Sequence, residues 1–276
     1  MKNVLIPTDF SESASYASDL GVEIAKKMNT GVTFLHLIST PVDWRKLPLE
    51  KESLYPETKA AIGEAKDQLV KLERRAEKNG VEISSSLIFN TGIEEIHKYI
   101  NKEHYSLVVM GTHGQKGFNK MAGTNTHKVM SKSPVPVLAV KRGDGPVLPK
   151  NIAIASDFEN ESLADFEMIM EIAIALGAEI QLLYVNTPYN FRESTEIEEK
   201  LNRFLQKYSG QNVKHTVINA HDEQRGIEKF LKNCHCDMLG VITHGRAGLS
   251  PLYRKSISEG LINKLEMPVL SINSNE

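Results

Sequence analysis

The second half of the chain repeats the first, and this repeat limits the fold more than any other feature. Residues 3–10 (NVLIPTDF) match residues 151–158 (NIAIASDF), and the tripeptide Thr-His-Gly at 112–114 returns at 243–245. The spacing of roughly 130–150 residues is far longer than the roughly 20–50 residues of a solenoid repeat. With 276 residues the chain is long enough for two globular domains. The repeat therefore predicts two copies of one domain in tandem.

A stretch rich in Gly and Pro, GDGPVLP at 143–149, separates the copies. It predicts a linker, with domains at 1–145 and 146–276. Within each copy, short apolar strands alternate with helical segments, which predicts an α/β fold with right-handed crossovers. We expect two flavodoxin-like (Rossmann-like), doubly wound domains, each with a five-stranded parallel sheet.

The expected elements are as follows. The strands are 3–7, 32–38, 81–89, 106–110 and 135–140 in the first copy, and 151–155, 179–185, 213–219, 237–242 and 267–272 in the second. The helices of the first copy are 11–28, 57–79, 92–102 and 126–132, and Ser11 is the expected N-cap of the first of them.

Composition excludes several classes of protein. Hydrophobic residues make up 41% and charged residues 25%, as in an ordinary soluble protein. The net charge of −2 argues against binding to nucleic acid. No apolar run approaches the roughly 20 residues that span a membrane, and the first residues are too soon polar for a signal peptide. We therefore expect a cytoplasmic protein with neither nucleic acid nor membrane as a partner.

The two cysteines form the segment Cys234-His235-Cys236. They are too close together to cross-link a fold, which suits a reducing compartment. Two thiols and one imidazole are too few for a structural zinc site, and the segment precedes a strand, at the edge away from its domain's ligand crevice. We expect no metal site.

A glycine-rich loop follows an apolar strand in the first copy. The strand ends in Met110-Gly111, the loop continues through 112–114, and Gly123 precedes the helix expected at 126–132. Free backbone N–H groups and a helix N-terminus favour an anion, so the loop predicts a phosphate site. An ordinary strand-to-helix turn remains an alternative. Lysines in or after the loop would favour an anion or form a solvated helix face; they are Lys116, Lys120, Lys128 and Lys132.

A carboxylate is expected beside this loop. In open α/β sheets, ligands bind beyond the carboxyl ends of the strands, where the strand order reverses. Asp9 follows the first strand and Gly111 ends the fourth, and these strands should be neighbours at that point. Asp9 could accept hydrogen bonds from a ribose or a base, or cap the next helix, while Leu37 could offer backbone groups to a base edge. The constellation indicates a nucleotide site, most simply for adenine.

Over both halves the chain resembles a tandem universal stress protein of the UspA type. Nucleotide-binding members of that family carry Gly-x2-Gly-x9-Gly-Ser/Thr after the fourth strand and an Asp after the first. The first copy matches this pattern, except that its spacer, 115–122, has eight residues. The resemblance implies that the first domain binds ATP, ADP or AMP, with Mg²⁺ as a companion of ATP. The residues implied are Pro7, Thr8, Asp9, Leu37, Met110, Gly111, His113, Gly114, Gly123, Thr124 and Asn125.

The second copy departs from the pattern. Ile242 replaces the first glycine and Lys255 the last, although Asp157, Gly245 and Ser256 are retained as weak candidates. Non-glycine residues resist positive φ at roughly 1–2 kcal/mol each. With lost hydrogen bonds, binding should weaken by about two or three decades. We expect a weak or vacant second site. Another anion could still be attracted by the basic residues Arg246, Arg254 and Lys255.

The leading functional hypothesis is a regulatory protein of a stress response that binds adenine nucleotide in its first domain and acts on an unidentified protein partner. A slow ATPase and a nucleotide-free adaptor are the alternatives. We identify no catalytic residue, since neither a nucleophile elbow nor a Walker motif is present. Catalysis beyond slow ATP hydrolysis is not expected.

Assembly is indicated by the fifth strands. Pro136 and Pro268 begin them, which suits an edge position, and an apolar edge strand needs cover. In the family that the chain resembles, domains pair through this strand. We therefore expect an intrachain pseudo-dimer, with a homodimer as a further option.

Overall fold

A computed structural model of the protein describes residues 2–92, 95–112, 124–141, 143, 145–159, 163–244 and 260–274. The first domain contains β1 (Asn3–Pro7), α1 (Glu12–Lys27), β2 (Val32–Ser39), the 3-10 helices η1 (Trp44–Lys46) and η2 (Leu49–Leu54), α2 (Pro56–Glu77), β3 (Ile83–Asn90), the 3-10 helix η3 (Ile96–Tyr99), β4 (Tyr105–Gly111), α3 (Thr124–Lys132) and β5 (Val137–Val140). The second contains β6 (Asn151–Ala155), α4 (Leu163–Leu176), β7 (Glu179–Asn186), the 3-10 helix η5 (Pro188–Asn190), α5 (Ser194–Lys207), β8 (Val213–Asn219), α6 (Glu223–Leu231), β9 (Met238–His244) and β10 (Val269–Ser274).

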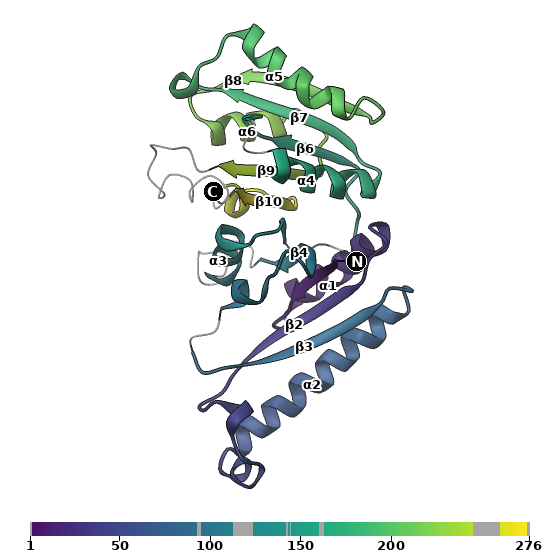
Figure 1. Ribbon diagram of the computed structural model, residues 1–276, viewed down its shortest axis with the longest axis vertical. Coiled ribbons are helices and arrows are strands. Elements are labelled where there is room, and N and C mark those ends of the chain that lie inside the picture. Colours follow the sequence, from purple (N-terminus) through teal and green to yellow (C-terminus); the bar gives the residue numbers. More distant parts are fainter. Residues whose placement is uncertain are drawn as a thin grey trace.

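The strands of both domains form one ten-stranded sheet in the order β3-β2-β1-β4-β5-β10-β9-β6-β7-β8 (Figure 1). Within each domain the pairing is parallel, and the chain winds outward from the first strand before crossing back to the fourth. The predicted doubly wound fold is confirmed. The order places β1 beside β4, as the proposed position of the crevice requires.

The two halves meet through their fifth strands. β10 pairs antiparallel with β5, and Leu270 lies opposite Leu138. The predicted intrachain pseudo-dimer is therefore confirmed. Because this pairing is antiparallel, the carboxyl end of β5 lies beside the amino end of β10, and the two crevices open at opposite edges of the sheet. The domain boundary after residue 145 stays a prediction.

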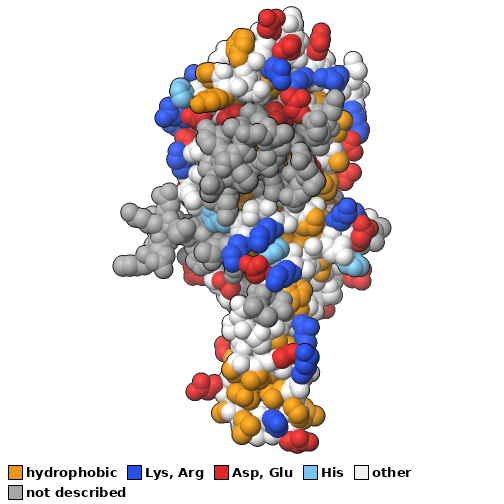
Figure 2. All heavy atoms as spheres, turned by 60° about the vertical axis from the view of Figure 1, so that its left-hand side comes forward, with side chains coloured by type: hydrophobic (Ala, Val, Ile, Leu, Met, Phe, Trp, Pro, Cys, Tyr) orange, Lys and Arg blue, Asp and Glu red, His pale blue; other side chains and the backbone are white. Residues whose placement is uncertain are grey.

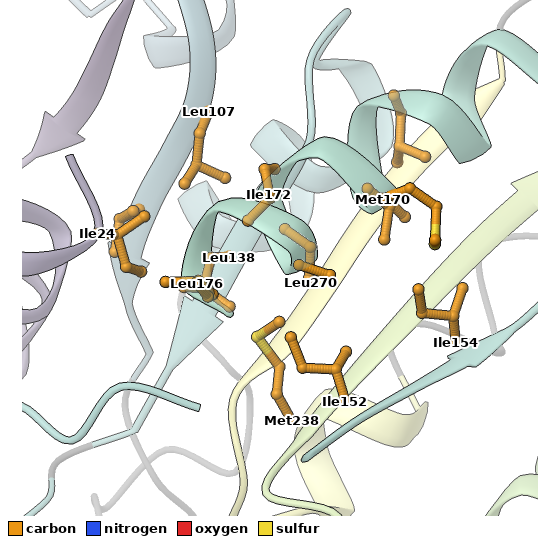
Figure 3. Close-up of a cluster of buried hydrophobic side chains, with 14 of the residues drawn as sticks. Ile24, Leu107, Leu138, Ile152, Ile154, Met170, Ile172, Leu176, Met238 and Leu270 are labelled. Carbon is orange, nitrogen blue, oxygen red and sulfur yellow. The ribbon is translucent and has the colours of Figure 1, made fainter. Parts of the chain in front are cut away.

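The hydrophobic core is continuous across this junction. Side chains from α1, β4 and β5 of the first domain belong to the same buried cluster as side chains from β6, α4, β9 and β10 of the second. Figure 3 shows this part of the cluster, with Ile24, Leu107, Leu138, Ile152, Ile154, Met170, Ile172, Leu176, Met238 and Leu270 labelled. The two domains therefore bury apolar surface against each other, which favours a fixed arrangement.

One expected helix is wrong. Among the described residues of 92–102, only 96–99 are helical, as the single 3-10 helix η3. Glu95, at the N-cap position, makes no capping hydrogen bond, because its carboxylate accepts one from Lys128 Nζ at 2.7 Å. In the second domain, Asp222 caps α6 by accepting a hydrogen bond from Arg225 N, and a full helix forms there.

Hydrophobic side chains are exposed at both far ends of the molecule (Figure 2). At the first-domain end they include Leu49 and Leu54 of η2, and at the second-domain end Tyr189 and Phe191, on the loop that contains η5. None of the described helices has the length and apolar character needed to cross a membrane.

Candidate functional site

A tight turn after β1 holds Asp9 at the carboxyl edge of the sheet. Thr8 Oγ1 accepts a hydrogen bond from Phe10 N at 3.0 Å, and Asp9 Oδ1 accepts one from Ser11 N at 3.0 Å. Phe10 adopts a left-handed conformation, with φ of 61°. Helix α1 is capped by Ser11, whose side chain accepts from Ala14 N, as predicted. Asp9 thus stabilises the turn, while Ser11 caps the helix.

The second domain repeats this turn. Ser156 Oγ accepts from Phe158 N at 3.0 Å, Asp157 Oδ1 accepts from Glu159 N at 3.4 Å, and Phe158 has φ of 52°. Sequence reasoning missed the left-handed phenylalanines, although the repeated Thr/Ser-Asp-Phe was a signal. Asp157 therefore retains the local geometry of Asp9.

His36 supports the first turn from the neighbouring strand. Its Nδ1 lies 2.7 Å from Thr8 O, and its ring centroid lies 4.4 Å from that of Phe10. Leu37 follows on β2, which pairs in parallel with β1 so that Leu35 lies beside Pro7. Leu37 is therefore about level with Asp9 along the sheet. The structure brings the predicted residues of β1 and β2 to one edge.

Gly111 ends β4 against the first turn of α1. A Cβ atom at Gly111 would lie 2.5 Å from the backbone C and O of Ser13 and 2.9 Å from Ala14 N. Glycine is therefore required here by packing. The same contact brings the N-terminal end of α1, which carries a partial positive charge, to the carboxyl end of β4. Met110, just before it, is buried.

The second domain differs at the equivalent position. Ile242 is buried in the shared core, with 6% of its surface exposed. A side chain there is incompatible with the close approach that Gly111 permits. After Ile242 the backbone stays in the sheet, because β9 remains paired with β10 through His244 opposite Ser274.

Thr112, which sequence reasoning did not select, directly follows β4. Its N–H donates to Val140 O at 2.7 Å, and its hydroxyl is buried without a hydrogen-bond partner in the described part of the chain. Nearby, the Thr126 hydroxyl donates to Gly111 O at 3.4 Å and ties α3 to the strand end. The sequence signal that could have identified Thr112 is a polar residue directly after an apolar strand. A buried hydroxyl without a partner among the described residues could donate a hydrogen bond to a ligand atom at this position.

Several predicted site residues lie outside the described residues; they are His113, Gly114, Gly123, Gly245 and Ser256. Thr124 and Asn125 are described only as backbone, at the start of α3.

Two of the lysines after the loop belong to a separate charge cluster. Lys128 Nζ lies 2.7 Å and Lys132 Nζ 3.8 Å from the Glu95 carboxylate, and His97 Nε2 lies 3.7 Å from it. The hydrogen bond from Lys128 lowers the pKa of Glu95, and burial lowers the pKa of His97. These lysines therefore tie α3 to the segment around η3, where both approach the one carboxylate of Glu95.

In the Cys234–Cys236 segment, the surroundings of Cys236 disfavour its thiolate. Both cysteines are free and partly buried, and burial raises the pKa of Cys236 to about 12. The described residues contain no cluster of three or more His, Cys, Asp or Glu side chains suited to a metal ion.

Comparisons with known proteins agree across the whole chain. The profile of the universal stress protein family matches residues 1–141 and 149–273. A universal stress protein of Methanocaldococcus jannaschii is 29% identical over 143 residues, which make up 51% of this chain and 82% of that protein. One from Mycobacterium bovis is 22% identical over 97% of this chain and 95% of its own length.

A solved structure shows the same fold over the full length. A universal stress protein from Archaeoglobus fulgidus superposes with a TM-score of 0.76 at 18% identity, covering 99% of this chain and 98% of that one. At this identity the likeness concerns the fold alone.

Proposed function

Because the chain belongs to the universal stress protein family, we propose that it is a stress-response regulator whose first domain binds an adenine nucleotide. The ligand would lie at the carboxyl ends of β1 and β4, with Asp9 toward the adenosine, Leu37 toward the adenine and the loop after Gly111 around the phosphates. AMP, ADP and ATP all suit this arrangement. Mg²⁺ would enter with the phosphates of ATP.

The observation that carries the proposal is that Asp9 and Thr112 follow neighbouring strands, β1 and β4, and are level with each other when the register is continued to the point where the strand order reverses. The first supplies a carboxylate held by its turn, and the second a buried hydroxyl without a partner among the described residues. The N-terminus of α1 adds a positive partial charge at the same place, through its contact with Gly111. A carboxylate for a sugar or base beside donors for a phosphate is the chemistry of a nucleotide site.

The proposal includes one strong site per chain. Asp157 keeps the turn of Asp9, but Ile242 fills the space beside the strand end, and the following backbone is engaged in the sheet. Phosphate binding beside the end of β9 would therefore lack the space that Gly111 leaves in the first domain, and among the described residues the backbone of 243–244 is paired with β10.

Calorimetry of the purified chain with ATP, ADP, AMP and adenosine tests the proposal. We expect one site per chain, loss of binding in Asp9→Ala, and unchanged binding in the matched control Asp157→Ala. Thr112→Val should weaken the nucleotides but leave adenosine unaffected. Two equivalent sites, or equal effects of the two Asp substitutions, would contradict the proposal.

The same preparation separates the alternatives. Turnover of ATP that disappears in Asp9→Ala would favour a slow ATPase. A chain that binds none of the four ligands would favour a nucleotide-free adaptor. We also propose a cytoplasmic location and an unidentified protein partner, and analytical ultracentrifugation would show whether the chain forms a homodimer.

A further inference from the structure

A compact charge cluster lies in the second domain, whose glycine pattern has lost two of its three glycines. Glu159, just after the Asp157 turn, receives two cations on the same oxygen, Oε1. Lys200 of α5 donates to it, with only 13% of the lysine side chain exposed, and Arg192 Nη2 lies 4.0 Å away. One carboxylate thus faces two positive charges drawn from separate elements.

The guanidinium of Arg192 has hydrogen-bond donors that the described residues do not satisfy. Its Nε is buried and has no hydrogen-bond partner among the described residues, and 4.0 Å from Nη2 to Glu159 is beyond hydrogen-bond range. The Nε and Nη2 edge is the fork with which arginine binds an oxyanion through two parallel hydrogen bonds. A buried donor without an acceptor is costly, so this edge favours a ligand that supplies one.

The segment that carries Arg192 is held in place by Asn186 at the end of β7. Arg192 N donates to Asn186 Oδ1 at 3.0 Å, and Asn186 Nδ2 donates to Arg192 O at 3.2 Å. Next to Asn186, Thr187 is 2% exposed, and its hydroxyl likewise lacks a partner in the described part of the chain. The same loop therefore carries two polar groups without a partner among the described residues, the Thr187 hydroxyl and Arg192 Nε.

We propose that Arg192 and Lys200 form a second anion site for a phosphate group, with the hydroxyl of Thr187 from the same loop as a further donor, and that Glu159 occupies this site in the free protein. Charge favours this ligand over a carboxylate, because a phosphate near neutral pH carries about −1.5 to −2 and matches both cations, whereas Glu159 compensates one. Glu159 is 36% exposed and can swing into solvent when a phosphate replaces it.

This site is independent of the nucleotide site proposed for the first domain. It uses none of the residues of the degenerate glycine pattern. Thr187 and Arg192 lie on the loop between β7 and α5, and Lys200 lies on α5. Loss of nucleotide binding in Asp9→Ala should leave phosphate binding at this site unchanged. Loss of phosphate binding at this site should likewise leave nucleotide binding in the first domain unchanged.

The test is titration calorimetry of the full chain with inorganic phosphate, with acetate as a monoanion for comparison. Glu159→Gln should bind phosphate about tenfold more tightly than the original chain, since it removes the resident competitor. Adding Arg192→Lys to Glu159→Gln should weaken phosphate binding about tenfold, because the positive charge stays but the two parallel hydrogen bonds of the guanidinium are lost. Acetate should bind more weakly than phosphate throughout.

The matched control is Glu167→Gln. Glu167 of α4 also pairs with a lysine of α5, Lys207, but with a single cation among the described residues. It should leave phosphate binding unchanged. Equal affinity of Glu159→Gln and the original chain, no loss on adding Arg192→Lys, or an equal gain in Glu167→Gln would each overturn the proposal.

Thr187→Val provides a second test should Glu159→Gln fold poorly. Removing a buried hydroxyl without a partner should leave the melting temperature unchanged or raise it, while phosphate binding weakens severalfold. Unchanged phosphate binding in this variant would count against the site, whatever happens to its stability.

Discussion

Leu138 of β5 lies directly opposite Leu270 of β10, and the two leucines hold equivalent positions in the two domains. The flanking pairs exchange in the same way, Val137 with Ser271 and Ala139 with Val269. A local two-fold axis therefore passes between the leucines. Both are buried, with 1% and 0% of their surface exposed, so the axis runs through the shared core.

Truncating either leucine should destabilise the whole chain. We expect Leu138→Ala and Leu270→Ala each to cost about 2–5 kcal/mol, through lost burial and a cavity at the junction. Urea denaturation followed by circular dichroism measures this. Leu54→Ala, at an exposed position, should change stability by less than about 0.5 kcal/mol. Separate unfolding of one domain in either junction variant would show that the core is not shared.

In each domain the first helix packs against the fourth strand through a glycine. The glycine belongs to the helix in the first domain and to the strand in the second. In the first, Gly21 of α1 faces Val109 and Ile6, and a Cβ at Gly21 would lie 2.5 Å from Ile6 Cδ1. In the second, Ile169 takes the position of Gly21, and Gly240 takes that of Val109, with a Cβ at Gly240 3.3 Å from Ile169. The larger side chain therefore lies on the strand in the first domain and on the helix in the second, and each contact pairs one glycine with one larger residue.

This exchange predicts coupling between Ile169 and Gly240. Gly240→Val alone should destabilise by about 1–3 kcal/mol through overpacking. Ile169→Ala should destabilise through a cavity, and the double variant should be more stable than the sum of the two predicts. A double-mutant cycle from denaturation data measures the coupling; additive effects would contradict the exchange.

Gly111→Ala should damage both stability and nucleotide binding. Its methyl group would meet the Ser13 backbone, which cannot move without displacing α1, so we expect a loss of about 1–3 kcal/mol. ATP affinity, measured on the folded fraction, should fall as well. Gly63→Ala in α2 is the matched control, since nothing lies within 4 Å of its added Cβ. That variant should gain about 0.5–1 kcal/mol from helix propensity.

Acid should weaken the ion pairs that Glu228 of α6 and Glu95 make with lysines. The pKa of Glu228 is lowered by hydrogen bonds from Lys264 and Gln224, just as Lys128 lowers that of Glu95. A lowered carboxyl pKa in the folded state contributes stability above the unfolded value of 4.5, and this is lost as pH falls through the folded pKa.

Melting temperatures measured at a series of pH values would show this loss as a decline below 4.5. The decline should be shallower in Glu228→Gln and in Glu95→Gln than in the original chain. The exposed Glu50→Gln serves as control. An unaltered slope in both variants would contradict a role for these pairs in acid stability.

Most strands could be predicted because their apolar runs and the flanking turn residues are local signals. The helix expected over 92–102 was wrong: among its described residues only 96–99 are helical, and Glu95, just before them, makes no capping hydrogen bond and pairs with Lys128 from α3. Gly111 was predicted as a phosphate residue, which stays a prediction, and its close approach to Ser13 adds a packing reason for glycine that the sequence did not reveal. The orphaned hydroxyl of Thr112 depends on burial, which a single sequence does not reveal.

By itself, the sequence determined two copies of an α/β domain, the place of Asp9 after the first strand and the loss of two glycines from the second copy, because repeats, hydrophobic periodicity and turn residues act between near neighbours. Only the tertiary structure decided that Leu138 and Leu270 share a two-fold axis, that Ile169 and Gly240 replace Gly21 and Val109, and that Arg192 and Lys200 meet at Glu159. These relationships depend on which segments approach across the sheet, and close packing and charge pairing act only after that approach.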